Sequence, residues 1–378
     1  MSDVEMMIAA VCRNDEELWF YDNIRHYICF SDCNFDEVHI VKEVDARDIK
    51  DLGSGVGVIM KNQYLYIAYQ NKIAVLVYSI ELKEYHIFFA DWKAEDNFYN
   101  VEEVDGYFLF IPAKVTGTIF LFNIFQEIFE QKKWLNETFL NLDEMTLFGY
   151  KERKKFFLPL YNKEILLELD LSDYSCSTHT YEGLSIGTIC SCNNQKWIAQ
   201  TDCAELVCVE QEYLDNSYQY SRYNVGAERK EEFFSRLLTC DGKIIGIPRF
   251  GDYVLIVDRN NGKAIRLYHE LFKIHDKGST SHTFGYYYKN HILYLLPWGT
   301  HKLLCVDTGQ AMIYEKDIEV CTSDYFKYYY IKPEYEKDRN DLEDYLNWIA
   351  VKDCPESKNG YEGKQNKYVG RIIHEALR

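Results

Sequence analysis

Half of the histidines in this chain fall within one short stretch. Five of the ten lie between His269 and His301. Imidazole side chains titrate near neutral pH, so they serve as hydrogen-bond donors and proton carriers. His275 and His282 belong to the connecting stretch "HELFKIHDKGSTSHTF", and His301 follows Trp298 closely. We therefore take His275, His282 and His301 as candidate ligand-contacting residues.

Four further side chains complete the candidate binding site. Trp298 offers a flat apolar face for a sugar ring or a cation, and Arg249 can hold a carboxylate or phosphate through two hydrogen bonds. Lys114 and Tyr161 occupy equivalent turns earlier in the chain. Structural alternatives stay open: Trp298 covering the edge of a neighbouring sheet, and Arg249 pairing with Asp252 at the surface.

Motifs for metal binding and for common enzyme chemistry are missing from the sequence. A zinc site would need three imidazoles to converge, and no C-x-x-C pair occurs. The sequence also lacks G-x-S-x-G, H-E-x-x-H, a Walker loop and G-x-G-x-x-G, and "GSGVG" at 53–57 precedes an apolar strand. We therefore predict no metal and no cofactor.

A repeated pattern indicates the elements that position these residues. Several apolar runs end in a proline, continue through a polar turn into a second apolar run, and close on a polar residue. The prolines are Pro112, Pro159, Pro248 and Pro297. The closing residues are Asp32, Ser79, Asn123, Asp170, Glu210, Asp258 and Asp307. They recur every 40–50 residues or so, which is the period of a repeat architecture.

Each repeat predicts four short strands. A turn residue precedes each proline position, and Asn and Asp-Gly are typical of tight hairpins because they tolerate positive φ. These residues are Asn14, Asn62, Asp105-Gly106, Arg153, Asn194, Asp241-Gly242 and Asn290. The middle runs, such as "YVLIVD", are apolar without alternation, which is typical of strands covered on both faces. The fourth runs, such as "EYHIFFA", are mixed, as outer edge strands are. Proline has no N–H for a ladder, so it marks where the second strand leaves its sheet.

This organisation resembles the β-propeller superfamily at the level of architecture, without the WD dipeptide or the Gly-Gly pair of its best-known repeat families. The resemblance implies an all-β fold: a seven-bladed β-propeller of four-stranded antiparallel blades over residues 1–332. A short helical C-terminal tail is expected over 333–378. The resemblance also implies that ligands bind on the rim formed by the turns between second and third strands, where the candidate residues lie.

Composition restricts the partners. The net charge of −18 disfavours nucleic acid and anionic membrane surfaces. The N-terminus lacks the basic start of a signal peptide, and no segment reaches the length of a membrane helix, so we expect a cytoplasmic protein without membrane insertion. Most of the twelve cysteines fall inside expected strands, which favours reduced thiols buried as small apolar side chains.

The function expected from these features is a non-catalytic binding module. Its rim would take a protein segment or a carbohydrate-like ligand. The alternative is a propeller enzyme, a lyase or hydrolase acting on a glycan or small molecule, with catalytic residues contributed by separate blades. Residues 369–377 set apolar side chains on one helical face, and this helix either caps the ring or docks on a partner.

Overall fold

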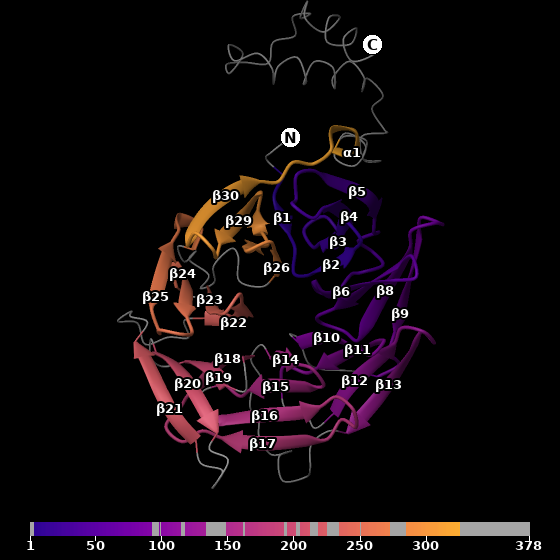
Figure 1. The fold of residues 1–378 in the computed structure, drawn as a ribbon. Helices are drawn as coiled ribbons and strands as arrows, with labels where there is room; N and C mark the ends of the chain where they lie inside the picture. Colours follow the sequence, from indigo (N-terminus) through magenta and orange to yellow (C-terminus); the bar gives the residue numbers. More distant parts are fainter. Residues whose placement is uncertain are drawn as a thin grey trace, which may run out of the picture. The chain divides into compact units, whose positions relative to one another are not determined.

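Seven similar β-sheets make up most of the protein. The computed structural model describes residues 4–92, 98, 100–114, 118–133, 149–161, 163–192, 195–201, 205–211, 218–224, 234–249, 251–272 and 285–325. The chain divides into two compact units, residues 2–319 and residues 320–378 together with Met1. Within the described part of the larger unit lie seven four-stranded sheets, in which every neighbouring pair of strands is antiparallel. Figure 1 shows them as blades around a central opening, with the first strand of each blade innermost.

The blades follow one another along the chain. Blade 1 is β2 (Val11–Asn14), β3 (Glu17–Asp22), β4 (Tyr27–Asp32) and β5 (Val38–Glu43). Blade 2 is β6 (Gly55–Lys61), β7 (Tyr64–Tyr69), β8 (Ala74–Ser79) and β9 (Glu84–Phe89). Blade 3 is β10 (Asn100–Val104), β11 (Tyr107–Ile111), β12 (Thr118–Asn123) and β13 (Ile128–Lys133). Blade 4 is β14 (Tyr150–Glu152), β15 (Lys155–Pro159), β16 (Ile165–Asp170) and β17 (Cys176–Thr180).

The second half of the ring repeats this order. Blade 5 is β18 (Ile186–Cys192), β19 (Gln195–Gln200), β20 (Glu205–Gln211) and β21 (Tyr218–Asn224). Blade 6 is β22 (Phe234–Cys240), β23 (Lys243–Pro248), β24 (Tyr253–Asp258) and β25 (Ala264–Tyr268), followed by the short helix η2 (Glu270–Phe272). Blade 7 is β26 (Tyr286–Lys289), β27 (Ile292–Leu295), β29 (Lys302–Asp307) and β30 (Met312–Asp317). The seven-bladed β-propeller predicted from the repeat is therefore confirmed.

Tight hairpins join the first and second strands. Both central residues have positive φ in four of them: Asn62 and Gln63, Asp105 and Gly106, Asp241 and Gly242, and Asn290 and His291. Positive φ at both positions is the mark of a type I′ turn, whose twist matches that of the flanking strands. The Asn and Asp-Gly signals in the sequence thus mark these turns correctly.

The closing residues of the repeats organise the turns between third and fourth strands. In six of the seven repeats, the side-chain oxygen accepts hydrogen bonds from backbone N–H groups two to four residues later, whereas Glu210 lies within β20 (Glu205–Gln211) and its carboxylate accepts from the Gln195 side chain. The bonds run to Asp32 from Asp36 (2.7 Å), to Ser79 from Leu82 (3.2 Å), to Asn123 from Phe125 (2.9 Å) and Gln126 (3.1 Å), to Asp170 from Ser172 (2.8 Å), to Asp258 from Asn260 (2.8 Å), and to Asp307 from Gly309 (2.9 Å) and Gln310 (2.8 Å). A side-chain acceptor at this position recurs because it replaces a backbone partner inside the turn.

The core lies between blades. On β11, Phe108 and Phe110 pack against side chains of blade 2, whereas Leu109 and Ile111 pack against side chains of blade 4. Both faces of a middle strand are therefore covered, which explains apolar runs without alternation. The fourth strands alternate between exposed and half-buried residues, as β9 and β25 show. Pro159 and Pro248 end β15 and β23, as expected for residues that cannot donate to a ladder.

The cysteines expected inside strands follow the same pattern of burial. Cys29, Cys190, Cys208 and Cys305 are buried, while Cys192 and Cys240 are half-buried. Their thiols therefore serve mainly as small side chains of the core.

The N-terminal segment lies in the seam between blades 7 and 1. Strand β1 (Met6–Met7) pairs with β28 (Trp298–Thr300), which forms within the expected turn between the second and third strands of blade 7. The backbone N–H of Ile8 also donates to the carbonyl of Pro297 (2.9 Å). On the blade 1 side, Asn23 donates from its backbone N–H (2.9 Å) and its side-chain amide (3.1 Å) to the carbonyl of Met7. Residues 6–8 are thus held by both blades.

Polar contacts join the same two blades near their outer strands. The Lys316 ammonium donates to the Asn34 carbonyl (2.7 Å) and to Asp36 (2.5 Å), and the Val38 N–H donates to the Glu319 carbonyl (2.7 Å). Blade 1 already holds four strands of its own, so the ring closes through these contacts and β1.

The C-terminal predictions fall mostly beyond the described residues. The smaller unit contains the short helix α1 (Thr322–Tyr325) in its described part. The helix expected over 369–377, its docking role and the boundary at 332/333 lie outside the described residues and stay predictions.

Asp22 is a buried carboxylic acid within the blade 7–blade 1 seam. It is completely buried and accepts N–H groups from Met7 (3.1 Å) and Ile24 (3.1 Å), with the Arg25 guanidinium 3.9 Å away. Burial raises the pKa of Asp22 from its ordinary 3.8 to about 6, although the two N–H donors and Arg25 act in the opposite direction. The folded protein therefore binds this proton more tightly than the unfolded chain does.

Replacement of Asp22 should change how stability depends on pH. Because the folded pKa is the higher one, the stabilising contribution is greatest below the ordinary pKa and is lost as pH rises through about 6. The difference in free energy of unfolding, Asp22→Asn minus wild type, should therefore increase by about 1–1.5 kcal/mol as the pH is raised from 5 to 8. Urea unfolding at several pH values measures this difference. A difference that is constant with pH would contradict the role given to Asp22.

Candidate functional site

The residues predicted from sequence lie on the proline rim, defined here as the turns between second and third strands together with the connections between blades. Lys114 and Tyr161 are exposed in the turns of blades 3 and 4. Arg249 is half-buried in the turn that follows β23. The backbone of Trp298 pairs with that of Met7, so this half-buried residue belongs to the seam.

The structure brings only some of these residues near one another. Trp298 and His301 both belong to blade 7, and Arg249 belongs to the neighbouring blade 6. Lys114 and Tyr161 belong to blades 3 and 4, which blade 5 separates from blade 6 (Figure 1). Binding of a carbohydrate-like ligand at this rim stays a prediction. His275 and His282 lie outside the described residues.

The remaining histidines of the dense stretch each approach a carboxylate. The atoms of His269 and Glu315 lie 3.4 Å apart, those of His291 and Asp241 2.5 Å apart, and those of His301 and Asp317 4.0 Å apart. Each described histidine of the stretch therefore has its own acidic neighbour.

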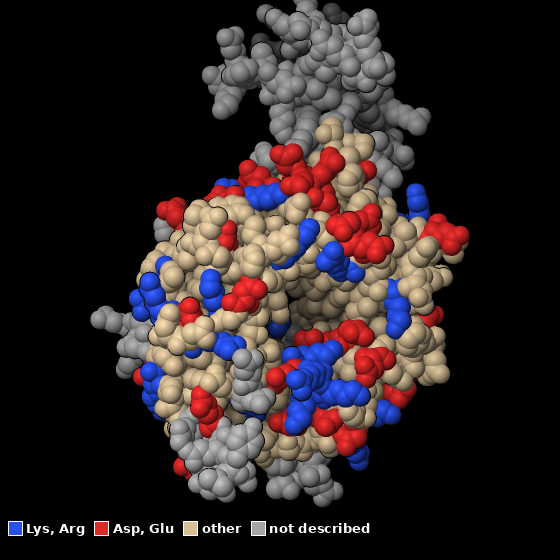
Figure 2. Space-filling view, viewed as in Figure 1, with Lys and Arg blue, Asp and Glu red and all other residues tan. Residues whose placement is uncertain are grey.

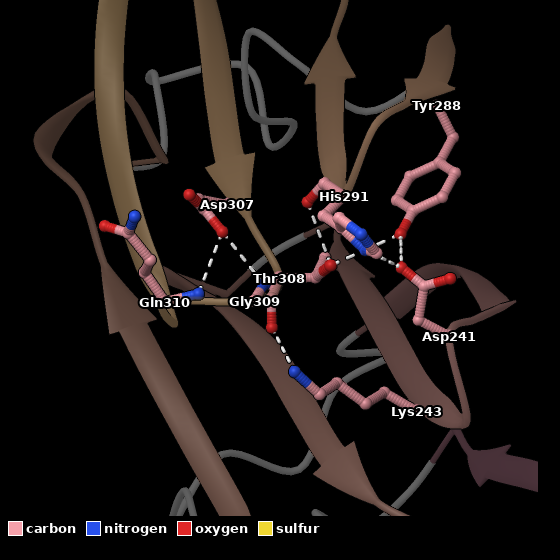
Figure 3. Close-up of polar contacts among 8 residues, drawn as sticks. All are labelled: Asp241, Lys243, Tyr288, His291, Asp307, Thr308, Gly309 and Gln310. Carbon is pink, nitrogen blue, oxygen red and sulfur yellow. Dashed lines mark hydrogen bonds and ion pairs between the residues drawn. The ribbon is translucent and has the colours of Figure 1, made fainter.

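The contact between His291 and Asp241 belongs to a polar cluster that joins blades 6 and 7, shown in Figure 3. The Asp241 carboxylate accepts hydrogen bonds from the Tyr288 hydroxyl and from Nδ1 of His291. The Thr308 hydroxyl donates to the carbonyl of His291 (2.9 Å), and the Lys243 ammonium donates to the carbonyl of Thr308. Two turns that are separate in sequence are thus linked by side chains.

The electrostatics of this cluster favour an ionised carboxylate. Hydrogen bonds from Tyr288 and then from His291 hold the pKa of Asp241 below its usual range, and burial followed by the nearby carboxylate raises the pKa of Tyr288 to about 12. A carboxylate can only accept, so the proton of the short contact lies on Nδ1 of His291. In the neutral ring, Nε2 is then left as an acceptor on an imidazole that is 68% exposed.

Sequence reasoning treated Asp241 and Asn290 as turn residues only. The two residues occupy equivalent positions in consecutive repeats, and equivalent turns of adjacent blades lie next to each other on one rim. This equivalence was the sequence signal that could have predicted a contact between the two turns. We call this rim the hairpin rim; it consists of the turns between first and second strands and between third and fourth strands.

Large apolar side chains are exposed on the hairpin rim of blades 2 and 3. The exposed fractions are 66% for Leu82, 63% for Phe125, 48% for Ile128 and 40% for Tyr64. We call these four residues the apolar rim surface. The sequence signal was a large apolar residue inside the turn that follows a closing residue, as in Asn123–Phe125.

Phe125 is the best defined member of the apolar rim surface. Its ring lies against Gly106 of the adjacent hairpin, where an added Cβ would meet it at 2.4 Å. The Lys61 ammonium of blade 2 lies 3.8 Å from the centre of the same ring, which is a cation–π contact. Phe125 therefore bridges blades 2 and 3 while most of its surface faces solvent.

A group of basic residues follows on blade 4. Lys151, Arg153, Lys154 and Lys155 stand in the hairpin between β14 and β15, and the last three are exposed. We call these four residues the basic hairpin. Figure 2 shows basic side chains gathered beside the ring opening, where Figure 1 places β14 and β15, with acidic side chains nearby.

Charged residues also come from the innermost strands. Glu102 on β10 and Arg236 on β22 belong to blades 3 and 6, and the guanidinium lies 5.9 Å from the centre of the Tyr286 ring. Burial raises the pKa of Glu102, and the charges of Arg236 and Lys151 partly offset that effect.

Comparison with known proteins identifies a fold and no family. No family model and no curated protein matches this chain. The structure is similar to the Dos1 propeller, with a TM-score of 0.55, 9% identity and coverage of 85% of this chain and 86% of that one. It is also similar to the Cps50 (Swd1) β-propeller domain of Myceliophteria thermophila, with a TM-score of 0.55, 9% identity and coverage of 81% and 97%.

A third similar chain comes from the mitotic checkpoint complex, with a TM-score of 0.52, 9% identity and coverage of 84% of this chain and 90% of that one. At these identities the likeness concerns the fold alone. No helix among the described residues has the length and apolar character needed to cross a membrane.

The Asp241 cluster generates a prediction about ionisation. Tyr288→Phe should raise the pKa of Asp241 toward its ordinary value, and His291→Ala should raise it by a smaller amount, since the tyrosine bond is the larger cause of the lowering. Because the folded pKa lies below the unfolded one, the stabilisation by Asp241 is present above the ordinary pKa and is lost as pH falls. Carboxyl ¹³C NMR titration measures the shift, and an unchanged Asp241 pKa in Tyr288→Phe would refute the assignment.

Proposed function

We propose that this protein is a non-catalytic interaction module that binds a protein segment on its hairpin rim. Propeller folds commonly mediate protein interactions, and one of the similar chains comes from a multiprotein complex. The observation that carries the proposal is the apolar rim surface. Four large apolar side chains stand exposed on the same rim of two adjacent blades, and exposed apolar surface is a feature of interaction sites.

The geometry of Phe125 supports its role as the central contact. Aromatic side chains with well-defined positions are frequent binding hot spots because little conformational entropy is lost when they are covered. The Phe125 N–H donates to Asn123 (2.9 Å), and the ring rests on Gly106, so both backbone and side chain are positioned before binding. A partner would complete the burial of a side chain that the fold leaves mostly exposed.

The proposal includes a cytoplasmic location. The buried thiols of Cys29, Cys190, Cys208 and Cys305 pack as core side chains, a role that suits a reducing compartment.

A selection from a display library of random twelve-residue peptides against the full chain tests the function. Selected peptides should bind with an affinity that Phe125→Ala weakens by about 1–3 kcal/mol, because the substitution removes a central apolar contact. The melting temperature should change little, since the side chain is 63% exposed. Fluorescence anisotropy with labelled peptides measures the affinities.

Phe89→Ala is the matched control. Phe89 is 53% exposed but ends β9 on the opposite rim, so its removal should leave peptide affinity unchanged. Equal effects of the two substitutions, or a selection that returns no binding peptide, would refute the proposed function.

A further inference from the structure

The basic hairpin is physically continuous with the apolar rim surface. The Lys151 ammonium of blade 4 donates to the carbonyl of Glu103 on blade 3. The Glu103 carboxylate accepts the N–H of Gly106 (3.2 Å), and Gly106 carries the ring of Phe125. A segment of a few residues that covers Phe125 therefore meets the basic hairpin next.

The basic hairpin keeps uncompensated positive charge. Lys155 pairs with Glu168, which also binds His179 (2.9 Å). Lys151 donates to a neutral carbonyl, and its charge also acts on the carboxyl group of Glu102. Arg153 and Lys154 are exposed and form no ion pair with any residue in the described part of the chain. Glu152 is the one acidic residue within the hairpin sequence.

This charge is unusual in its setting. The chain carries a net charge of −18, so an acidic partner is repelled by most of its surface and attracted at few places. Two acidic residues of blade 3 lie close to Phe125 in the chain: Asp105, which is exposed, and Glu127, which is half-buried. Negative groups of a partner are thus directed away from blade 3 and toward blade 4.

We infer that the partner is an acidic protein segment, with an apolar side chain seated on Phe125 and Leu82 and with Asp or Glu residues over Arg153 and Lys154. The inference rests on the proposed function and names the chemical class of its ligand. Electrostatic complementarity of this kind selects partners and orients them, while the apolar contact provides most of the affinity.

Peptides from the random library provide the probe, because the selection imposes no charge in advance. The selected sequences should combine an aromatic or large aliphatic residue with two or more acidic residues on one side of it. The double charge reversal Arg153→Glu with Lys154→Glu should weaken their binding about tenfold or more at 50 mM salt, and by less at 500 mM salt. Circular dichroism confirms that the variant remains folded.

The matched control carries the same change of net charge at two other sites. Lys50→Glu with Lys263→Glu alters two exposed lysines, one in the connection between blades 1 and 2 and one in the last turn of blade 6. Binding of the selected peptides should be nearly unchanged in this control.

The outcomes separate the inference from the proposed function. Peptides that need Phe125 but are neutral or basic, or that ignore the reversal at Arg153 and Lys154, would overturn the inference and leave the function standing. Equal losses in the reversal and its control would also overturn it, since net charge alone would explain them. Binding of a labelled single-stranded oligonucleotide that competes with the peptides would replace the acidic protein segment with nucleic acid as the ligand.

Discussion

Every blade of this ring has two apolar faces to cover, so the structure depends on closing the seam between its first and last blades. Between other blades the closure follows from chain order, because consecutive repeats pack face to face. Between blades 7 and 1 it requires separate contacts, and Met7 supplies several of them beside those of Lys316 and Val38. The Met7 N–H and carbonyl bind Asp22 and Asn23 of blade 1, while its strand pairs with Trp298 of blade 7. The cost of burying the Asp22 carboxyl is tolerated at the one seam where the chain has no neighbouring repeat in sequence.

The fold could be predicted in detail because its signals are local. A type I′ turn needs two consecutive residues that accept positive φ, and Asn62 and Asp105-Gly106 are residues of this kind at the turns themselves. The turn between third and fourth strands needs a side-chain acceptor, which Asp170 or Asn123 provides to N–H groups two or three residues later. These turn residues act within a few positions of the chain, so they can be recognised in the sequence without knowledge of the ring.

The candidate site was predicted much less well because its contacts are long-range. The density of histidines drew attention to the proline rim, yet His291 approaches Asp241, fifty positions earlier in the chain, on the opposite rim. Trp298 was expected either as a flat wall for a ligand or as a cover for the edge of a neighbouring sheet, and its backbone pairs with the N-terminal strand. Contacts of this kind depend on which blades are neighbours and on the strand register, and neither can be predicted from the residue types alone. His275 and His282 lie outside the described residues, so the ligand site expected around them stays a prediction.

The devices that build the repeat also prepare the surface that would bind a partner. Asn123 occupies the closing position of its repeat, where its side chain organises a turn. That same turn contains Phe125. Gly106 is required by a φ of 89°, and its missing side chain leaves the space that the Phe125 ring occupies. Exposed residues of such a turn can therefore be substituted without disturbing the core, because the Asn123 side chain and Gly106 hold the turn. Recognition on such a rim begins from a surface already fixed in shape, which lowers the entropy lost when a flexible segment settles on it.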